Sequence, residues 1–424
     1  MKLIKNKVIL IICIMLIVIP FSSYASSTES NYYTVEQVRT VFLGELNSKI
    51  NTAEKTEITK LVKEWKILYD QRVKTDNGSQ SLKEGLLMDN INKTLNKYTE
   101  KYLIDSDESY DSSKEDKEYK NFVVENLKIV LTQDDYKRLY ELCEKYADYD
   151  TEESEIDSIL DEVENILNKY KNLKADEIMQ YIFKGSENLL GIYDIKGSEL
   201  ENKTVPFVTL SKSDEKITKT YPKLWKYVTS IIPESYFENF DRLIISTDGP
   251  YNDLAYVIPN DSIASRWNIS IDPADAEEKN LFYETIIHEY CHYITLNDTQ
   301  GSYFKKPVVK TYSDGEIVTN ENSYLNTFNK KFWGILSEES PYVNDGYLFY
   351  LRHKSEFVNE YSSTVVSEDI CESFAFFVLR DKPKSNTKVD QKLLFFYNYP
   401  EFVEFRNIVR NNINKVDAEF AKAS

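Results

Sequence analysis

A short apolar segment in the second half of the chain, Thr285–Ile294, carries the pattern His-Glu-x-x-His. Its residues are His288, Glu289 and His292, and they include two of the three histidines of the chain. Residues four apart lie on one face of a helix, so both imidazoles could bind one zinc ion, with Glu289 beside them. We therefore predict a zinc-binding helix from about Glu277 to Leu296. The alternative, two histidines on a solvated face, fits poorly with such apolar neighbours.

The spacing also indicates a type of chemistry. A catalytic zinc ion keeps one coordination position for water, lowers the pKa of that water, and works with a nearby carboxylate that removes the proton. Glu289 is the predicted general base, and one catalytic Zn²⁺ is the predicted cofactor. His288 and His292 supply only two ligands, so a third must come from elsewhere in the chain.

Three acidic residues are candidates for the third ligand. Asp298 lies six residues after His292, where zincins with a longer motif place a ligand, but the turn there normally needs a glycine and this chain has Thr295. Glu368 and Glu372 are four residues apart in a phenylalanine-rich helical segment and share a face. One of them could reach the metal, while the other orients a ligating histidine from the second shell.

The segment Tyr361–Ala375 resembles the second motif of the gluzincin peptidases related to anthrax lethal factor and the Pro-Pro endopeptidases. In that group a tyrosine precedes the glutamate ligand by seven residues, and a second glutamate follows it by four. Tyr361, Glu368 and Glu372 match this spacing, and the His-Glu-x-x-His segment matches the first motif. The likeness covers roughly residues 185–413.

This resemblance implies a zincin-like α+β domain and a zinc metalloendopeptidase. It implies that Glu368 is the third zinc ligand, after His288 and His292, and that Tyr361 donates its phenol to the developing oxyanion. The alternative is that Tyr361 is a core tyrosine without a catalytic role, since the chain has 32 tyrosines. The motifs do not identify the substrate or its cleavage site.

The apolar pattern divides the chain into three parts. Residues 26–184 have helical periodicity, interrupted by an acidic loop near residues 105–117, and predict an all-α region. Strand-like runs punctuated by proline and glycine begin near residue 185. We predict that residues 185–424 form the catalytic domain and have enough apolar residues to fold alone.

Four runs after residue 185 are predicted strands: Pro206–Leu210, Arg242–Ser246, Ala255–Ile258 and Trp267–Ile271. The last of these alternates apolar and polar residues and closely precedes the zinc helix. Such a strand could pair with an extended protein or peptide substrate through its backbone. The alternative is that it is an interior strand of the sheet.

The N-terminus has the layout of a secretory signal peptide, with three lysines, an apolar run and a small-residue cleavage site at Ala25. An N-terminal anchor is the alternative. Removal of residues 1–25 would change the formal net charge from −18 to −21, because three lysines are lost. We therefore expect a secreted protein with no integral membrane segment after processing and no binding of nucleic acid through bulk charge.

Three cysteines would remain: Cys143, Cys291 and Cys371. An odd number does not predict a disulfide framework, so buried thiols are preferred over a Cys291–Cys371 bridge. Two other functions stay open: a cell-surface adhesion protein with an inactive peptidase-like domain, and a delivered toxin component whose residues 26–184 bind a carrier. No sequence pattern bears on the oligomeric state.

Overall fold

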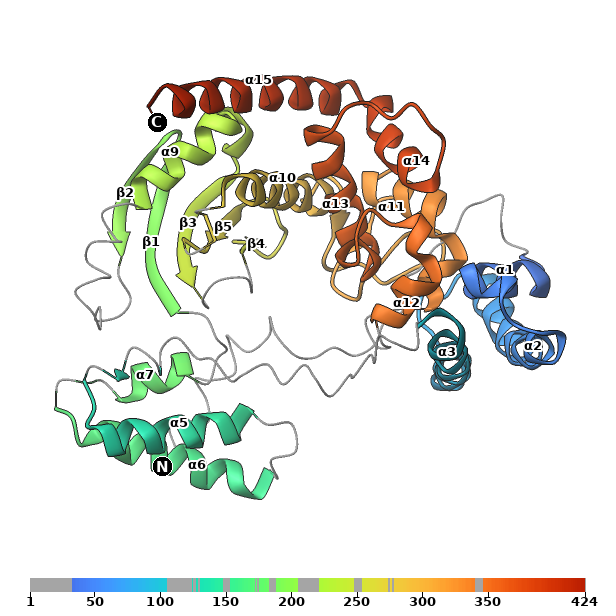
Figure 1. Cartoon of the computed structure of the whole chain (residues 1–424), viewed down its shortest axis with the longest axis horizontal. Helices are drawn as coiled ribbons and strands as arrows, with labels where there is room; N and C mark the ends of the chain where they lie inside the picture. The colour runs from blue at the N-terminus through green and yellow to red at the C-terminus, as the bar shows by residue number, and fades with distance from the viewer. Residues whose placement is uncertain are drawn as a thin grey trace. The chain divides into compact units, whose positions relative to one another are not determined.

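A computed structural model describes most of the chain, and Figure 1 labels its helices and strands. The described residues are 33–104, 124, 127–128, 130–147, 153–171, 173, 175–182, 188–204, 221–247, 254–273, 275–276, 278–339 and 346–423. The predicted signal peptide (1–25), acidic loop (105–117) and strand Pro206–Leu210 lie outside them. Within the described part, no helix combines the length and apolar character needed to cross a bilayer.

The fold is α+β, with a helical N-terminal region and a small mixed sheet, as predicted at that level. The chain divides into two compact units, each built from two separate segments. The first unit comprises Met1–Ser109 and Ile294–Phe402, and the second comprises Tyr110–Tyr293 and Val403–Ser424. This division does not follow the boundary predicted near residue 185, because the first helices of the chain belong with residues 294–402.

The sheet of the second unit has five strands in the order β2-β1-β3-β5-β4 (Figure 1). Strands β3 and β5 run parallel, and every other neighbouring pair is antiparallel. The strand bounds are β1 (Asn188–Lys196), β2 (Glu199–Thr204), β3 (Phe240–Thr247), β4 (Ala255–Pro259) and β5 (Trp267–Ile271). The predicted strands at β3, β4 and β5 are confirmed, whereas β1 and β2 were missed.

Strand β5 lies inside the sheet, between β3 and β4. All five of its residues are buried, with Trp267, Ile269 and Ile271 alternating with two polar residues. The polar residues have partners: the Ser270 hydroxyl lies 2.7 Å from that of Ser246 on β3, and Asn268 Nδ2 donates to Asn260 Oδ1 at 3.2 Å. The Asn268 Nδ2 and the Ser270 hydroxyl are thus each satisfied inside the sheet, as buried polar groups usually are.

Three helices of the second unit share a core of their own: α5 (Gln133–Ala147), α6 (Glu153–Asn168) and α7 (Ala175–Ile182). Their buried apolar side chains pack against one another and against Val124, Leu127 and Leu131, which precede α5. Exposed ion pairs such as Arg138–Glu162 lie on the outside. This is the usual pattern of amphipathic helices, and it confirms the predicted helical character of this stretch.

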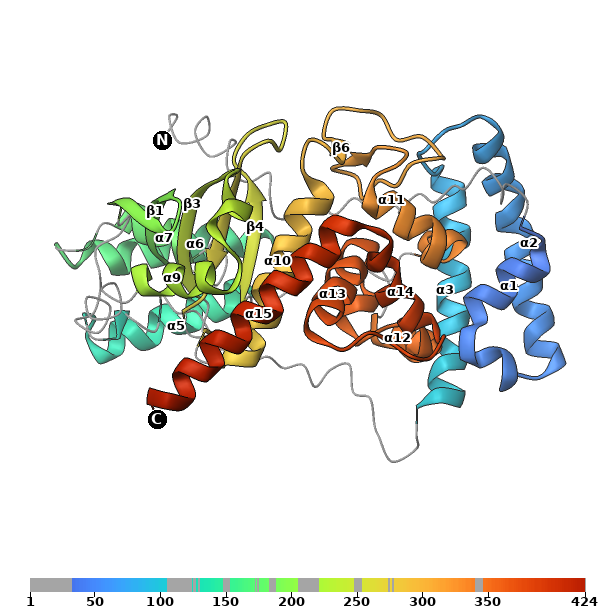
Figure 2. The same cartoon turned by 90° about the horizontal axis from the view of Figure 1, so that it is seen from above.

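The first unit is helical apart from one short hairpin. A capping box precedes each of the helices α1 (Val35–Leu43) and α2 (Thr52–Lys74). The N-cap of α3 (Leu82–Leu103) is Ser81. The later elements are β6 (Gly301–Ser302), β7 (Val318–Thr319), α11 (Tyr324–Phe328), α12 (Gly346–His353), α13 (Val366–Leu379) and α14 (Lys388–Phe395). Figure 2 shows α3 alongside α12, which it contacts.

Buried ion pairs join α2 and α3 to the 3₁₀ segment Gly334–Glu339. Arg72 Nε donates to Glu84 Oε1 at 2.9 Å, and its Nη2 donates to Glu338 Oε2 at 2.6 Å. All three side chains are almost fully buried. Burial alone would lower the pKa of Arg72, but Glu338 and Glu84 raise it above its usual value. The guanidinium therefore stays charged between two carboxylates.

A second buried arginine extends this contact. Arg352 of α12 pairs with Glu339, and its Nη1 donates to Asn96 Oδ1 and Thr99 Oγ1 of α3. Without α1–α3, buried Glu338 would lose Arg72, and Arg352 would lose Asn96 and Thr99. Leaving buried charges without these partners would cost several kcal/mol of folding free energy. The predicted ability of residues 185–424 to fold alone stays a prediction, and these contacts weigh against it.

Two glycines allow the helices to approach closely. Gly44 follows α1 with φ +48°, and a Cβ there would lie 2.2 Å from the carbonyl oxygen of Arg352. Gly78, in the turn between α2 and α3, would bring a Cβ to 2.4 Å from the carbonyl carbon of Pro307. Neither site has room for a side chain, because backbone atoms cannot move aside cheaply.

The Arg72 network can be tested by removing the shared cation. Arg72→Leu leaves Glu84 and Glu338 buried without it, so the free energy of unfolding should fall by about 3–5 kcal/mol. Glu36→Gln breaks an exposed ion pair of α1 with Arg39 and should cost less than about 1 kcal/mol. Urea titrations followed by tryptophan fluorescence compare the two variants. Equal, small losses would mean that the network does not stabilise the first unit.

Candidate metal-binding helix and catalytic residues

Helix α10 (Lys279–Leu296) carries the His-Glu-x-x-His residues, close to the predicted span. His288 and Glu289 are buried, and His292 is partly buried. The Nε2 atoms of the two histidines lie 3.0 Å apart. Two nitrogen ligands of a tetrahedral zinc ion, each at roughly 2.0–2.1 Å, would be about 3.3 Å apart. The imidazole pair therefore fits a shared metal ion with only a small adjustment.

Glu289 lies beside this pair. Its carboxylate Oε1 is 4.0 Å from His288 Nε2, so the two groups are neighbours without a direct hydrogen bond. A carboxylate that accompanies two metal-binding imidazoles without replacing either is what a general base requires. The predicted arrangement of His288, Glu289 and His292 on one helix is present.

Aromatic contacts hold α10 on the sheet of the second unit. Tyr293 packs edge-on against Phe240 of β3 and Trp267 of β5, at centroid distances of 4.8 and 5.9 Å. One turn earlier, Tyr290 stacks on Phe405 of α15 (Pro400–Ala423) at 4.8 Å. Tyr290 and Tyr293 alternate in sequence with His288 and His292. The helix is therefore fixed in rotation, and its histidines lie on a different face.

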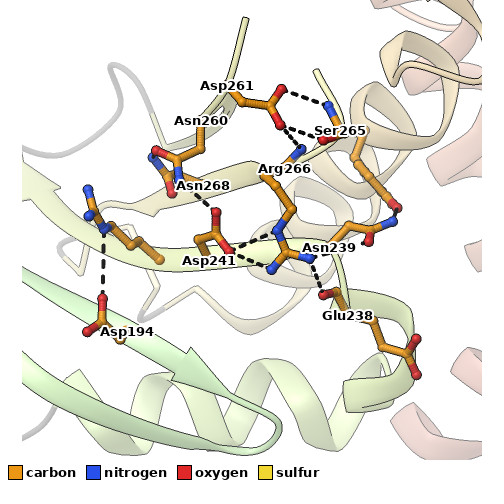
Figure 3. A network of polar contacts seen from close by, with 11 residues as sticks. Asp194, Glu238, Asn239, Asp241, Asn260, Asp261, Ser265, Arg266 and Asn268 are labelled. Atoms are coloured by element: carbon orange, nitrogen blue, oxygen red, sulfur yellow. Dashed lines mark hydrogen bonds and ion pairs between the residues drawn. The ribbon is translucent and has the colours of Figure 1, made fainter. Parts of the chain in front are cut away.

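A polar network secures the same helix where β3 and β5 begin (Figure 3). Asn239 donates from Nδ2 to the Tyr293 hydroxyl at 2.7 Å. Arg266 donates to Asp241 from Nε at 2.9 Å and to the Glu238 carbonyl from Nη1 at 2.9 Å. Hydrogen bonds from Arg266 lower the pKa of Asp241, which therefore stays an anion. The residues preceding β3 are thus bound both to α10 and to the loop before β5.

That loop, between β4 and β5, is closed by one carboxylate. Asp261 accepts from the backbone N–H groups of Ser265 and Arg266 at 2.9 and 3.1 Å (Figure 3), and from that of Ile263 at 3.1 Å. Ala264 adopts φ +60°, a conformation that few residues other than glycine take. Its carbonyl oxygen accepts from Trp267 Nε1 at 2.8 Å. The loop is ordered by these local bonds.

The strand that precedes α10 in sequence is an interior strand. Pairing of Trp267–Ile271 with an extended substrate was one of two interpretations, but β5 is already paired on both sides, with β3 and β4. The alternative interpretation, an interior strand, is therefore correct. The edge strands are β2 and β4; β4 is the one next to β5, and among the described residues no strand pairs with its outer side. Pro259 at its end is typical of an edge strand.

Glu368 lies in the first turn of α13, in the first unit. A carboxylate there is stabilised by the partial positive charge of the helix N-terminus. The side chain is partly buried. Burial, Asp314 and Glu368 together raise the pKa of Tyr312, which is fully buried, so these groups lie near one another. No sequence pattern pointed to Tyr312.

Asp369, next to Glu368, anchors this turn. It is fully buried, and its Oδ2 accepts from Trp333 Nε1 at 2.7 Å and from Lys392 Nζ of α14 at 2.6 Å. Burial raises the pKa of Asp369 and lowers that of Lys392. Lys392 also lies over the ring of Phe357, at 3.9 Å from its centroid. A buried ion pair directly beside Glu368 leaves the start of α13 little freedom.

Glu372, one turn after Glu368, is buried and accepts from Asn359 Nδ2 at 2.6 Å. Asn359 begins the turn that carries Tyr361, whose side chain is 55 % exposed. Tyr361 is therefore not the core tyrosine of the alternative interpretation. Glu368, Glu372 and Tyr361 belong to the first unit, whereas His288 and His292 belong to the second.

The other candidates are placed as follows. Asp298 is exposed in the turn after α10. His353, the third histidine of the chain, would be expected on the surface of an isolated helix, but it is 1 % exposed, because α12 packs it against Gly44 and Phe349. Among the described cysteines, Cys143, Cys291 and Cys371 are buried thiols and not disulfides, as preferred.

Comparisons with known proteins found no family model, no curated protein and no solved structure that matches this chain.

The burial of His353 predicts a pH effect on stability. Burial first, then Arg352 and two lysines of the α14 segment, lower the pKa of His353 well below its usual value. As the pH falls below about 6.5, His353 becomes protonated in the unfolded chain but stays neutral in the folded chain. His353 therefore makes folding less favourable as the pH falls. Buried Glu339, whose pKa is raised, works in the opposite direction.

His353→Gln isolates the histidine contribution. Between pH 7 and pH 5 the free energy of unfolding of the wild type should fall relative to the variant, by up to about 1.4 kcal/mol per pH unit below 6.5. Denaturant titrations at pH 5, 6 and 7 measure the difference. Parallel curves for the two proteins would contradict a neutral buried histidine.

Proposed function

We propose that the protein is a zinc-dependent endopeptidase that acts outside the cell. The observation that carries the proposal is the pair of imidazole Nε2 atoms 3.0 Å apart on α10, with buried Glu289 beside them. The gluzincin-like spacing of Tyr361, Glu368 and Glu372 supports it. Secretion rests on the signal-peptide layout of residues 1–25.

His288, His292 and Glu368 are the proposed ligands of the ion, a two-histidine, one-glutamate set that leaves a position open for water. Cys371 lies three residues after Glu368, on the same face of α13, and a thiolate with two imidazoles is also a metal donor set. Glu368 is preferred because a hard carboxylate is the usual partner of two histidines in a hydrolytic site. Bound zinc would polarise the scissile carbonyl and acidify water.

The remaining steps fall to side chains. Glu289 would take the proton of the attacking water and pass it to the leaving amine. Tyr361, half exposed on its turn, would donate its phenol to the developing oxyanion. The buried pair of Asp369 and Lys392 would hold the first turn of α13, and with it Glu368, in one orientation.

The substrate would be an extended peptide added to the edge of the sheet. β4 replaces β5 in this role, because its outer side can accept backbone hydrogen bonds from a further strand. The ordered loop from Asn260 to Arg266 continues from the end of β4 and presents Ile263, which is 54 % exposed. A zincin-like arrangement of the complete catalytic domain is part of this proposal.

The first test removes the base. Glu289→Gln should keep one zinc ion per chain and lose hydrolysis, because Glu289 is not a ligand. Zinc is measured by elemental analysis after metal-replete purification and dialysis, and hydrolysis by mass spectrometry of a proteome-derived peptide library. Wild-type protein without zinc, or a variant that still cleaves at the wild-type rate, would contradict the proposal.

The second test identifies the third ligand. Glu368→Gln should lose both zinc and activity, because two histidines alone hold the ion weakly. Cys371→Ser should keep both, and Asp298→Asn, which changes an exposed carboxylate, is the matched control. If Cys371→Ser loses zinc and Glu368→Gln keeps it, the thiolate is the ligand. If Asp298→Asn alone loses zinc, the longer zincin motif applies.

The third test concerns the oxyanion donor. Tyr361→Phe removes one oxygen from an exposed ring, so zinc content and melting temperature should be unchanged. A donor that acts mainly in the transition state should lower kcat by about 10²–10³ with little effect on KM. Normal kcat in a variant with normal zinc would leave Tyr361 without a catalytic role.

A further inference from the structure

The side-chain amide of Asn359 joins α13 to the turn that carries Tyr361, two parts of the first unit whose relative position matters for the proposed function. Its Nδ2 donates to Glu372 Oε2 of α13 at 2.6 Å. Its Oδ1 accepts the backbone N–H of Ser362 at 2.8 Å. One planar amide thus links the buried face of α13 with the turn that carries Tyr361.

The turn itself is stiff. The Ser362 hydroxyl donates to the Asn359 carbonyl at 2.7 Å, and the backbone N–H of Thr364 donates to the Tyr361 carbonyl at 3.1 Å. Ser362 and Ser363 are fully buried, whereas the Tyr361 ring between them and solvent is 55 % exposed. A rigid, buried backbone that presents an exposed phenol suits a group that must meet a ligand.

We infer that Asn359 is a positioning residue that fixes Tyr361 relative to α13. The inference rests on the proposed function, and it adds a residue that neither motif contains. Glu372 is one helical turn from Glu368, so the amide ties the proposed oxyanion donor to the helix of the proposed zinc ligand. Errors of about 1 Å in such a placement can cost up to about 100-fold in rate.

The two bonds of the amide can be separated. Asn359→Asp keeps the acceptor for the Ser362 N–H, but sets a carboxylate against the Glu372 carboxylate. In a Glu372→Gln background the same change restores a hydrogen bond with its direction reversed, from the Gln amide to the Asp carboxylate. The four proteins form a double-mutant cycle.

We expect Asn359→Asp to lower kcat by about 10- to 100-fold in the wild-type background, with KM and zinc content unchanged. In the Glu372→Gln background the same change should cost less than about 3-fold. Comparison with Glu372→Gln alone removes any other role of Glu372. Asn92→Asp is the matched control: Asn92 Nδ2 donates to the Glu339 carbonyl at 3.1 Å, so this variant should lower the melting temperature and leave kcat unchanged.

A second readout does not depend on catalysis. Hydrogen–deuterium exchange of the peptide 359–364, in zinc-free protein, should be faster in Asn359→Asp and return towards the reference in the double variant. Wild-type kcat and exchange in Asn359→Asp, or a loss that Glu372→Gln does not rescue, would overturn the inference. Rescue of exchange in a protein that hydrolyses no peptide would support the link between Asn359 and Glu372 and overturn the proposed function instead.

Discussion

The first unit depends on two arginines that neutralise carboxylates away from water. Arg72 and Arg352 each reach the segment Gly334–Glu339, one from α2 and the other from α12. A charge pair in a low-dielectric interior gains little net stability over apolar packing, but it tolerates few alternative arrangements, since each unpaired charge is costly. We interpret this network as what selects one packing of α1–α3 on the later helices. Gly44 and Gly78 restrict the packing in the same way, because the backbone of Arg352 or Pro307 lies too close to either glycine for a side chain to fit.

Periodicity and local spacing predicted the elements that bear the candidate site. The span of α10, the strand β5 and the helix α13 are all confirmed, because each has an unbroken pattern over at least five residues. β1 and β2 were missed; Glu199–Thr204 contains a single apolar residue, Leu200, and so offers no apolar alternation. The division into two units could not be read locally. It depends on pairs such as Arg72 and Glu338, which are 266 residues apart.

The candidate site shows the same limit. Spacing was enough to select His288, Glu289 and His292, because a helix brings residues four apart together without help from the rest of the chain. Asn359, Tyr312 and the Asp369–Lys392 pair were not selected, because tertiary packing brings them together. Tertiary packing also buries His353, which an isolated helix would leave exposed. The edge position of β4 likewise follows only from the order of the strands.

The interrupted course of the chain has a consequence for its synthesis. Helices α1–α3 are complete long before Glu338 and Arg352 have been made, and the whole of residues 110–293 comes between. At ribosomal rates of 5–20 residues per second, the 266 residues from Arg72 to Glu338 take about 15–50 s. During that time the emerging N-terminal helices expose apolar surface and a charged pair that still needs its third member. Assembly of the first unit must therefore be largely post-translational, and a chaperone that shields α1–α3 would be most useful in that interval.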